Sequence, residues 1–172
     1  MLRTLLITIL CQVTMAVFLK DDTCSHMDIS GPIIVKDDNT VIENTIIWAD
    51  PTSASDTSND YAIKIGADVE NVTIRNVLIY HAANGMGIYA FRPKNLRIEN
   101  VQVHAYGNDW GAQPCPTRKP FAGYDCSNIK IYHADGLVMD TIHVENGSRG
   151  VSLKNCTGAE VSNLVAKNVR GP

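Results

Sequence analysis

The chain has 172 residues, of which 45% are hydrophobic and 19% are charged. This length and composition are typical of one globular domain with a continuous core, and they exclude a chain that is disordered throughout. The formal net charge is -3, and the 15 lysines and arginines are scattered along the sequence. No cationic face for nucleic acid or for an anionic membrane is therefore indicated.

The N-terminus has the pattern of a secretory signal. Met1-Leu2-Arg3 is a short basic segment, and the uncharged residues after it reach Ala16, with small residues at the last and third-last positions. The uncharged stretch ends at Leu19, which is too short for the roughly 20 apolar residues of a membrane span. We expect residues 1–16 to be a cleaved signal peptide, residues 17–32 to be an N-terminal segment or cap, and the mature protein to be secreted, with no membrane contact.

A repeated pattern organises the rest of the chain. It reads apolar, any, apolar, any, Asn, apolar, any, apolar, and it occurs around Asn76, Asn100 and Asn163, with weaker copies around Asn44 and Thr141. Alternation on both sides of the Asn predicts two short strands joined by a bend. Asn tolerates a left-handed backbone and can hydrogen-bond to its equivalent in the next repeat, so we expect Asn44, Asn76, Asn100 and Asn163 to form a structural ladder.

A second alternating strand precedes each copy and advances with it. Its inward positions are Ile63, Ile88, Ile129 and Val151, at steps of 25, 41 and 22 residues, and the bends advance from position 76 by 24, 41 and 22 residues. In chain order the predicted strands run over 40–47, 62–66, 72–79, 87–91, 96–103, 128–132, 137–144, 150–154 and 159–166. A unit of this size is one β-helix coil, whereas leucine-rich repeats need spaced leucines and a helical return segment. We predict an all-β right-handed parallel β-helix, a solenoid of about five coils over residues 33–172.

The coil spacing and the Asn ladder resemble the pectin-lyase-like superfamily from about Ile33 to Val169. That superfamily includes pectate and pectin lyases, polygalacturonases, alginate epimerases and phage tailspikes. The resemblance implies that a polysaccharide groove runs along the outer face of the strands through Ile63, Ile88 and Ile129, walled by the loop at the end of each coil. Stacked coils need polar caps, and residues 168–172 contain none, so the stack is expected to be incomplete and truncated at its C-terminus.

The outward positions of these strands place lysines and aromatic side chains in a row. Lys64, Tyr89, Lys130 and Ser152 should lie roughly 4.8 Å apart from coil to coil, close to the repeat of a sugar chain. Lys64 and Tyr89 are therefore candidate substrate-binding residues. The alternative is that such outward residues are merely solvated.

A long aromatic insertion lies between Ala105 and Cys126. Long loops inside a compact repeat are usually functional or disordered. Tyr106, Asp109 and Trp110 are candidates for contact with sugar, and packing within the loop's own core is an equal alternative.

Proton abstraction beside a uronate carboxylate, as in a lyase or epimerase, needs a cation and a base. Lys130, Tyr132, His133 and Arg149 lie on adjacent coils and are the candidate catalytic residues, with His104 and Asp109 as further candidates from the loop side. The polygalacturonase motifs of the superfamily are absent, which disfavours a hydrolase. No metal or other cofactor is expected, since the acids lack a convincing calcium-ligand spacing.

The cysteines and glycosylation sequons fit a secretory route. Four of the five cysteines remain after signal cleavage, which suggests disulfides. Cys115 and Cys126 bracket one irregular stretch and are the favoured pair, whereas Cys24 and Cys156 are not expected to pair with each other. Three sequons begin at Asn71, Asn146 and Asn155.

Together these features predict a secreted, monomeric, carbohydrate-active protein whose partner is a polysaccharide. The favoured activity is that of a lyase or epimerase acting on an acidic glycan. A non-catalytic glycan-binding or adhesion module is the alternative, and the sequence leaves open whether the protein is an enzyme.

Overall fold

The structure is a computed structural model, and it describes residues 27–49, 61–82, 85–106, 127–147 and 149–169. All regular structure in these residues is β-strand, which confirms the predicted all-β class for this part of the chain. In chain order the strands are β1 (Asp28–Ser30), β2 (Ile33–Val35), β3 (Val41–Trp48), β4 (Tyr61–Ile65), β5 (Thr73–Ala82), β6 (Met86–Phe91), β7 (Lys94–Tyr106), β8 (Ser127–Tyr132), β9 (Asp135–Glu145), β10 (Arg149–Lys154) and β11 (Thr157–Lys167).

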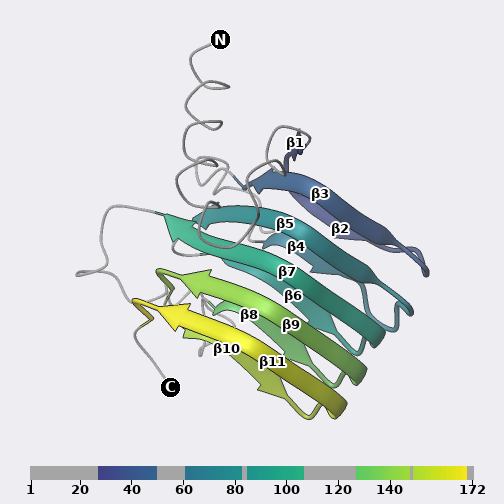
Figure 1. Ribbon diagram of the computed structural model, residues 1–172. Coiled ribbons are helices and arrows are strands. Elements are labelled where there is room, and N and C mark those ends of the chain that lie inside the picture. Colours follow the sequence, from purple (N-terminus) through teal and green to yellow (C-terminus); the bar gives the residue numbers. More distant parts are fainter. Residues whose placement is uncertain (1–26, 50–60, 83–84, 107–126, 148, 170–172) are drawn as a thin grey trace, which may run out of the picture.

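The strands form two parallel sheets that lie one behind the other (Figure 1). The long-strand sheet has the order β1-β3-β5-β7-β9-β11, and the short-strand sheet has the order β2-β4-β6-β8-β10. From β2 onward the chain therefore adds one strand to each sheet in turn. This topology is compatible with a parallel β-helix.

One hydrophobic core fills the space between the sheets. Parallel pairing keeps equivalent residues level, so Ile63, Ile88 and Ile129 form one inward row of the short-strand sheet. Val77 and Val101 are paired in the same way across the long-strand sheet, and all five side chains are fully buried. Each such burial contributes roughly 1.5–3 kcal/mol, so the alternating apolar positions account for the stacking of the strands.

The predicted bend residues have left-handed backbones. Asn44, Asn76, Asn100, Thr141 and Asn163 have φ angles of 50° to 55°. Asn76 donates its side-chain N–H to the Asn44 side chain at 3.2 Å, and Asn100 donates to Asn76 at 2.9 Å. The ladder changes partner at Thr141, whose side chain has no amide, and Asn163 donates instead to the carboxylate of Asp140 at 2.9 Å.

A second ladder, which our sequence analysis did not predict, lies five residues earlier in each repeat. Asn39, Asn71 and Asn95 have φ angles of 52° to 58°. Asn71 donates to Asn39 at 3.1 Å, and Asn95 donates to Asn71 at 3.0 Å. Gly136 and Gly158 continue the row with positive φ and no side chain. Each repeat of one short and one long strand thus has two left-handed bends with a ladder of asparagine side chains, whereas we predicted one.

A buried polar contact joins the two sheets at one edge of the core. His81 and Asn128 are at most 1% exposed, and the His81 Nε2 lies 2.7 Å from the Asn128 Oδ1. Asn128 also donates its side-chain N–H to the backbone carbonyl of Glu145 at 3.3 Å. The end of β5, the start of β8 and the end of β9 are therefore linked through one asparagine.

Several predictions fall outside the described residues. These are the signal peptide over 1–16, the Cys115–Cys126 disulfide, and the candidate residues Asp109 and Trp110. Cys156 is described, and it is a free, half-buried thiol. Strand β1 places part of the predicted N-terminal segment against β3. None of the described residues forms a helix long and apolar enough to cross a membrane.

Candidate functional site

The outer face of the short-strand sheet carries the predicted row. Lys64 on β4 is level with Tyr89 on β6, Tyr89 is level with Lys130 on β8, and Lys130 is level with Ser152 on β10. Neighbouring strands lie about 4.8 Å apart, so the row extends across four strands at nearly constant spacing. A second row beside it contains Phe91 on β6, which is level with Tyr132 on β8. We call these two rows the short-sheet face.

Cations and aromatic rings alternate on the short-sheet face. The Lys64 Nζ lies 5.2 Å from the ring centroid of Tyr61, and the Tyr61 and Tyr89 rings are 5.0 Å apart. The Lys130 Nζ lies 5.0 Å from the Tyr132 ring, and Lys130 is only 7% exposed. An ammonium over an aromatic ring is attracted by the ring quadrupole, so Tyr132 holds the Lys130 side chain in place.

Tyr89 is held in its neutral form. Burial raises the pKa of Tyr89 above its ordinary value, and the nearby Tyr132 raises it further. Burial disfavours the charged phenolate, so at neutral pH the hydroxyl is protonated and can donate a hydrogen bond. Tyr89 is thereby suited to binding a ligand oxygen and poorly suited to abstracting a proton.

The four candidate catalytic residues are not gathered at one point. Lys130 and Tyr132 lie two residues apart on one face of β8, whereas the exposed His133 follows β8 in a left-handed conformation, with its ring 5.6 Å from that of Phe91. Arg149 is level with Ser127, three positions before Lys130, which corresponds to roughly 10 Å along the strands. The structure therefore brings Lys130 and Tyr132 together. Arg149 lies near the opposite end of the same pair of strands, β8 and β10.

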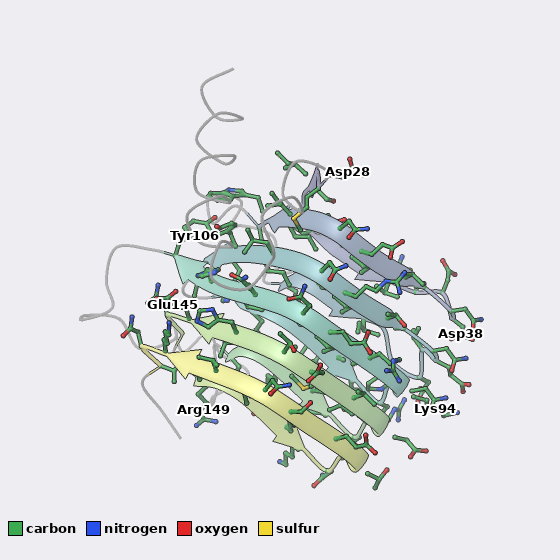
Figure 2. The ribbon with its side chains drawn as sticks, viewed as in Figure 1. Asp28, Asp38, Lys94, Tyr106, Glu145 and Arg149 are labelled. Atoms are coloured by element: carbon green, nitrogen blue, oxygen red, sulfur yellow. The ribbon has the colours of Figure 1, made fainter. Side chains whose placement is uncertain are left out.

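Tyr106 does not join the short-sheet face. It is the last residue of β7 in the long-strand sheet (Figure 2). Its ring stacks on Trp48 at 5.0 Å, and its hydroxyl donates to the Ala49 carbonyl at 2.7 Å. The predicted sugar contact from Tyr106 would thus belong to a different surface from that of Lys64 and Tyr89.

This different surface is the outer face of the long-strand sheet, where β3, β5, β7 and β9 end. One row contains Trp48, Tyr80, His104 and Glu145, which are level with one another. The rings of Trp48 and Tyr80 are 5.2 Å apart, those of Tyr80 and His104 are 5.4 Å apart, and the His104 Nδ1 lies 3.3 Å from the Glu145 Oε2. Figure 2 shows Glu145 and Tyr106 at strand ends on this side of the sheet.

A second row lies beside it and contains Gln102 and His143, which are level with each other on β7 and β9. The rings of His104 and His143 meet edge to face with centroids 5.9 Å apart. We call the six residues of these two rows the His104 cluster, namely Trp48, Tyr80, Gln102, His104, His143 and Glu145. Only His104 was named as a candidate from the sequence.

Both imidazoles of the His104 cluster are neutral at pH 7. Burial lowers the pKa of His104, Glu145 partly offsets this, and His143 lowers it further. Burial also lowers the pKa of His143, helped by Lys167. The carboxylate of Glu145 favours a proton on the His104 Nδ1, which leaves the His104 Nε2 as a hydrogen-bond acceptor.

Two buried polar groups of the His104 cluster lack hydrogen bonds to any described residue. Both amide atoms of Gln102 and the Nε2 of His104 are unpartnered, although the side chains are only 3% and 7% exposed. Period-two alternation places them on the outer face of the sheet, and nothing in the sequence pattern indicates that this part of the face is buried. The sequence therefore did not predict the His104 cluster as a whole.

The three sequons lie in different surroundings. The side-chain nitrogen of Asn71, to which a glycan would be attached, donates to Asn39 in the second ladder. Asn146 accepts a hydrogen bond from Asn168 at 3.2 Å. Asn155 is exposed at a left-handed turn after β10. Asn71 is exposed as well, whereas Asn146 is half-buried.

The described residues contain no group of three or more His, Cys, Asp or Glu side chains arranged to hold a metal ion. No protein-family model, curated protein or solved structure matches the chain. The site is therefore interpreted from its own geometry.

Proposed function

We propose that the chain is a right-handed parallel β-helix of the pectin-lyase-like type that binds an acidic polysaccharide along the short-sheet face. The observation that carries this proposal is the register of Lys64, Tyr89 and Lys130, one per strand at about the spacing of sugar units. The two cations, Lys64 and Lys130, lie two strands apart, roughly 9.6 Å, which matches carboxylates on alternate units of a uronate chain. The aromatic rings of Tyr61 and Tyr132 supply apolar surface beside each cation.

The proposed chemistry is that of a polysaccharide lyase or epimerase. Lys130 would neutralise the uronate carboxylate, which acidifies the neighbouring C–H, and Tyr132 is the nearest candidate base. Tyr89, protonated because of its raised pKa, would donate a hydrogen bond to a substrate oxygen. Transfer of the C–H proton to the base, with cleavage of the C–O bond and uptake of a proton from solvent by the leaving oxygen, gives an unsaturated product. Return of a proton to the opposite face, without cleavage, gives the epimer.

A non-catalytic glycan-binding module is the second candidate function. It is favoured by the position of Arg149, which lies three residues along the strand from the level of Lys130. The Arg149 guanidinium expected beside Lys130 and Tyr132 is therefore absent there, although Lys154 is level with Tyr132 and binding along the row is unaffected.

The test measures binding and turnover separately. The protein is titrated with polygalacturonate and with alginate by calorimetry, while ultraviolet absorbance reports unsaturated products and proton NMR reports epimerised units. Lys130→Ala should weaken binding at least ~10-fold, the effect of losing one charged hydrogen bond. Lys94→Ala is the matched control, because Lys94 is an exposed lysine at the start of β7 in the other sheet.

The outcomes separate the two candidates. Binding that depends on Lys130, with no product, supports the non-catalytic module. Product formation that is lost in Tyr132→Phe supports the lyase or epimerase. If neither polymer binds, or if Lys94→Ala and Lys130→Ala weaken binding equally, the short-sheet face is not the glycan site.

A further inference from the structure

The His104 cluster contains polar atoms that nothing among the described residues satisfies. Gln102 is 3% exposed, and neither its amide oxygen nor its amide nitrogen has a hydrogen-bond partner. The His104 Nε2 is in the same state two residues further along β7 and on the same face of the sheet. Burying an amide without a hydrogen bond destabilises a protein, and native structures rarely retain such groups without a reason.

The chemistry of the unpartnered atoms defines what would satisfy them. Gln102 offers one acceptor and one donor group side by side, and His104 offers an acceptor at Nε2, because Glu145 favours the proton on Nδ1. A hydroxyl group both donates and accepts, so neighbouring hydroxyls can bond to all three atoms. The two side chains are about 6.7 Å apart along the strand, within the reach of hydroxyls on one sugar ring.

The surroundings of these atoms favour an uncharged ligand. Glu145 and Lys167 are the charged residues in the row that begins at Trp48. They are level with each other on neighbouring strands, so their charges sum to zero. Trp48 is 37% exposed at the end of the same row, and aromatic faces bind the apolar face of a sugar ring. The row therefore carries no net charge that would favour an ionic ligand.

We propose that the His104 cluster is a second binding site, which takes a neutral, hydroxyl-rich sugar residue through Gln102 and the His104 Nε2, with Trp48 as its aromatic wall. This site is distinct from the short-sheet face in its sheet, its residues and the charge of its ligand. It does not depend on the proposed function of that face.

Tryptophan fluorescence can test the site directly. The chain has two tryptophans, so Trp110→Phe leaves Trp48 as the reporter. The Trp110→Phe protein is titrated with cellohexaose, mannohexaose and xylohexaose, three neutral oligosaccharides. A saturable change in the emission of Trp48 is expected with at least one of them. The same titration in the Lys130→Ala background should give the same affinity, because Lys130 lies on the other sheet.

The Gln102→Leu variant tests whether the Gln102 amide binds a ligand or is only buried, because the two cases predict different sugar affinities. Replacing the unpartnered amide by an apolar side chain of similar size should raise the melting temperature of the unliganded protein by roughly 2–4 °C, so this variant is expected to fold. It should also weaken sugar binding at least ~10-fold, because a ligand hydroxyl loses its partners. Thr73→Val, a polar-to-apolar change on β5 away from the cluster, should leave the affinity unchanged.

The proposal is overturned if none of the three oligosaccharides changes the Trp48 emission in a saturable way. It is equally overturned if Gln102→Leu binds as tightly as the parent protein, which would leave Gln102 as a buried amide without a ligand. Loss of binding in Thr73→Val as well as in Gln102→Leu would also contradict it.

Discussion

Gly87 makes room for the polar contact at the edge of the core. A Cβ atom at this position would lie 2.3 Å from the Val103 Cγ1 and 2.5 Å from the Asn128 carbonyl oxygen. Neither atom can move away freely, since Val103 is fully buried and the oxygen belongs to the backbone of β8. Gly87→Ala should therefore lower the free energy of unfolding by about 1–3 kcal/mol or more, measured by urea denaturation.

Gly31→Ala is the control for this prediction, because a Cβ there would meet no atom within 4 Å. Its unfolding midpoint should stay close to that of the parent protein. Equal effects of the two substitutions would show that the close approach at Gly87 does not limit stability.

The Asn ladder gives a second prediction at the scale of one residue. Asn76 accepts from Asn100, donates to Asn44 and has a φ angle of 54°. Asn76→Ala removes both hydrogen bonds and puts a residue with a Cβ, but without the local bonding of Asn, in a left-handed conformation. We expect a loss of roughly 2–4 kcal/mol in unfolding free energy.

Asn76→Gly removes the same hydrogen bonds and has no Cβ to strain the bend. Its loss in urea denaturation should be smaller than that of Asn76→Ala, although the greater flexibility of the unfolded glycine chain offsets part of this advantage. A larger loss for glycine than for alanine would mean that backbone strain contributes little at this bend.

The residue pattern predicted one ladder and contained the signal for the other. Asn39, Asn71 and Asn95 each precede a bend asparagine by five residues. The interpretation centred on the asparagine between two alternating segments and did not use the asparagines five residues earlier. The switch of Asn163 to Asp140 could not be predicted, because it depends on the direction in which a neighbouring carboxylate points.

At the scale of the strands, alternation determines which residues share a face. It therefore predicted the row of Lys64, Tyr89 and Lys130. Alternation does not determine whether an outward face is covered, and Gln102 and His143 are outward yet nearly inaccessible. The 22-residue step from Ile129 to Val151 already places Arg149 level with position 127, three residues before Lys130, and the register agrees with it.

His104 near the end of β7 and His143 near the end of β9 should make the free energy of unfolding depend on pH. The pKa of His104 is lowered in the folded protein, chiefly by burial, from an unfolded value of 6.5. Above pH ~6.5 neither state is protonated, and the ring adds no pH dependence. As the pH falls below this value, the unfolded chain binds a proton that the folded chain does not, so the free energy of unfolding decreases until the pH passes the folded pKa.

Urea denaturation between pH 7 and pH 5.5 measures this effect. The slope from His104 should be at most about 1.4 kcal/mol per pH unit, and His104→Gln should flatten the profile by that amount or less. His143, whose pKa is lowered mainly by burial, should contribute in the same direction. His133→Asn serves as the control on an exposed ring, and a profile unchanged in His104→Gln would contradict the prediction.

At the scale of the whole molecule, the rows of core residues extend to β11, the last described strand of the long-strand sheet. Val161 and Leu164 on β11 are level with Met139 and Ile142 on β9, which are at most 1% exposed. Val161 and Leu164 themselves are 43% and 42% exposed. Residues of the core rows therefore reach the surface on β11, which has β9 as its one paired neighbour among the described strands.

An exposed apolar edge strand offers both hydrogen-bonding groups and hydrophobic surface to another chain. We expect the 172-residue chain by itself to associate through β11 as its concentration rises. Val161→Lys places a charge on this edge and should lower the associated fraction in sedimentation velocity. Val138→Lys is the matched control, because Val138 is a half-buried valine on β9, which is paired with β7 and with β11. If both lysines reduce association equally, net charge rather than the edge of β11 controls it.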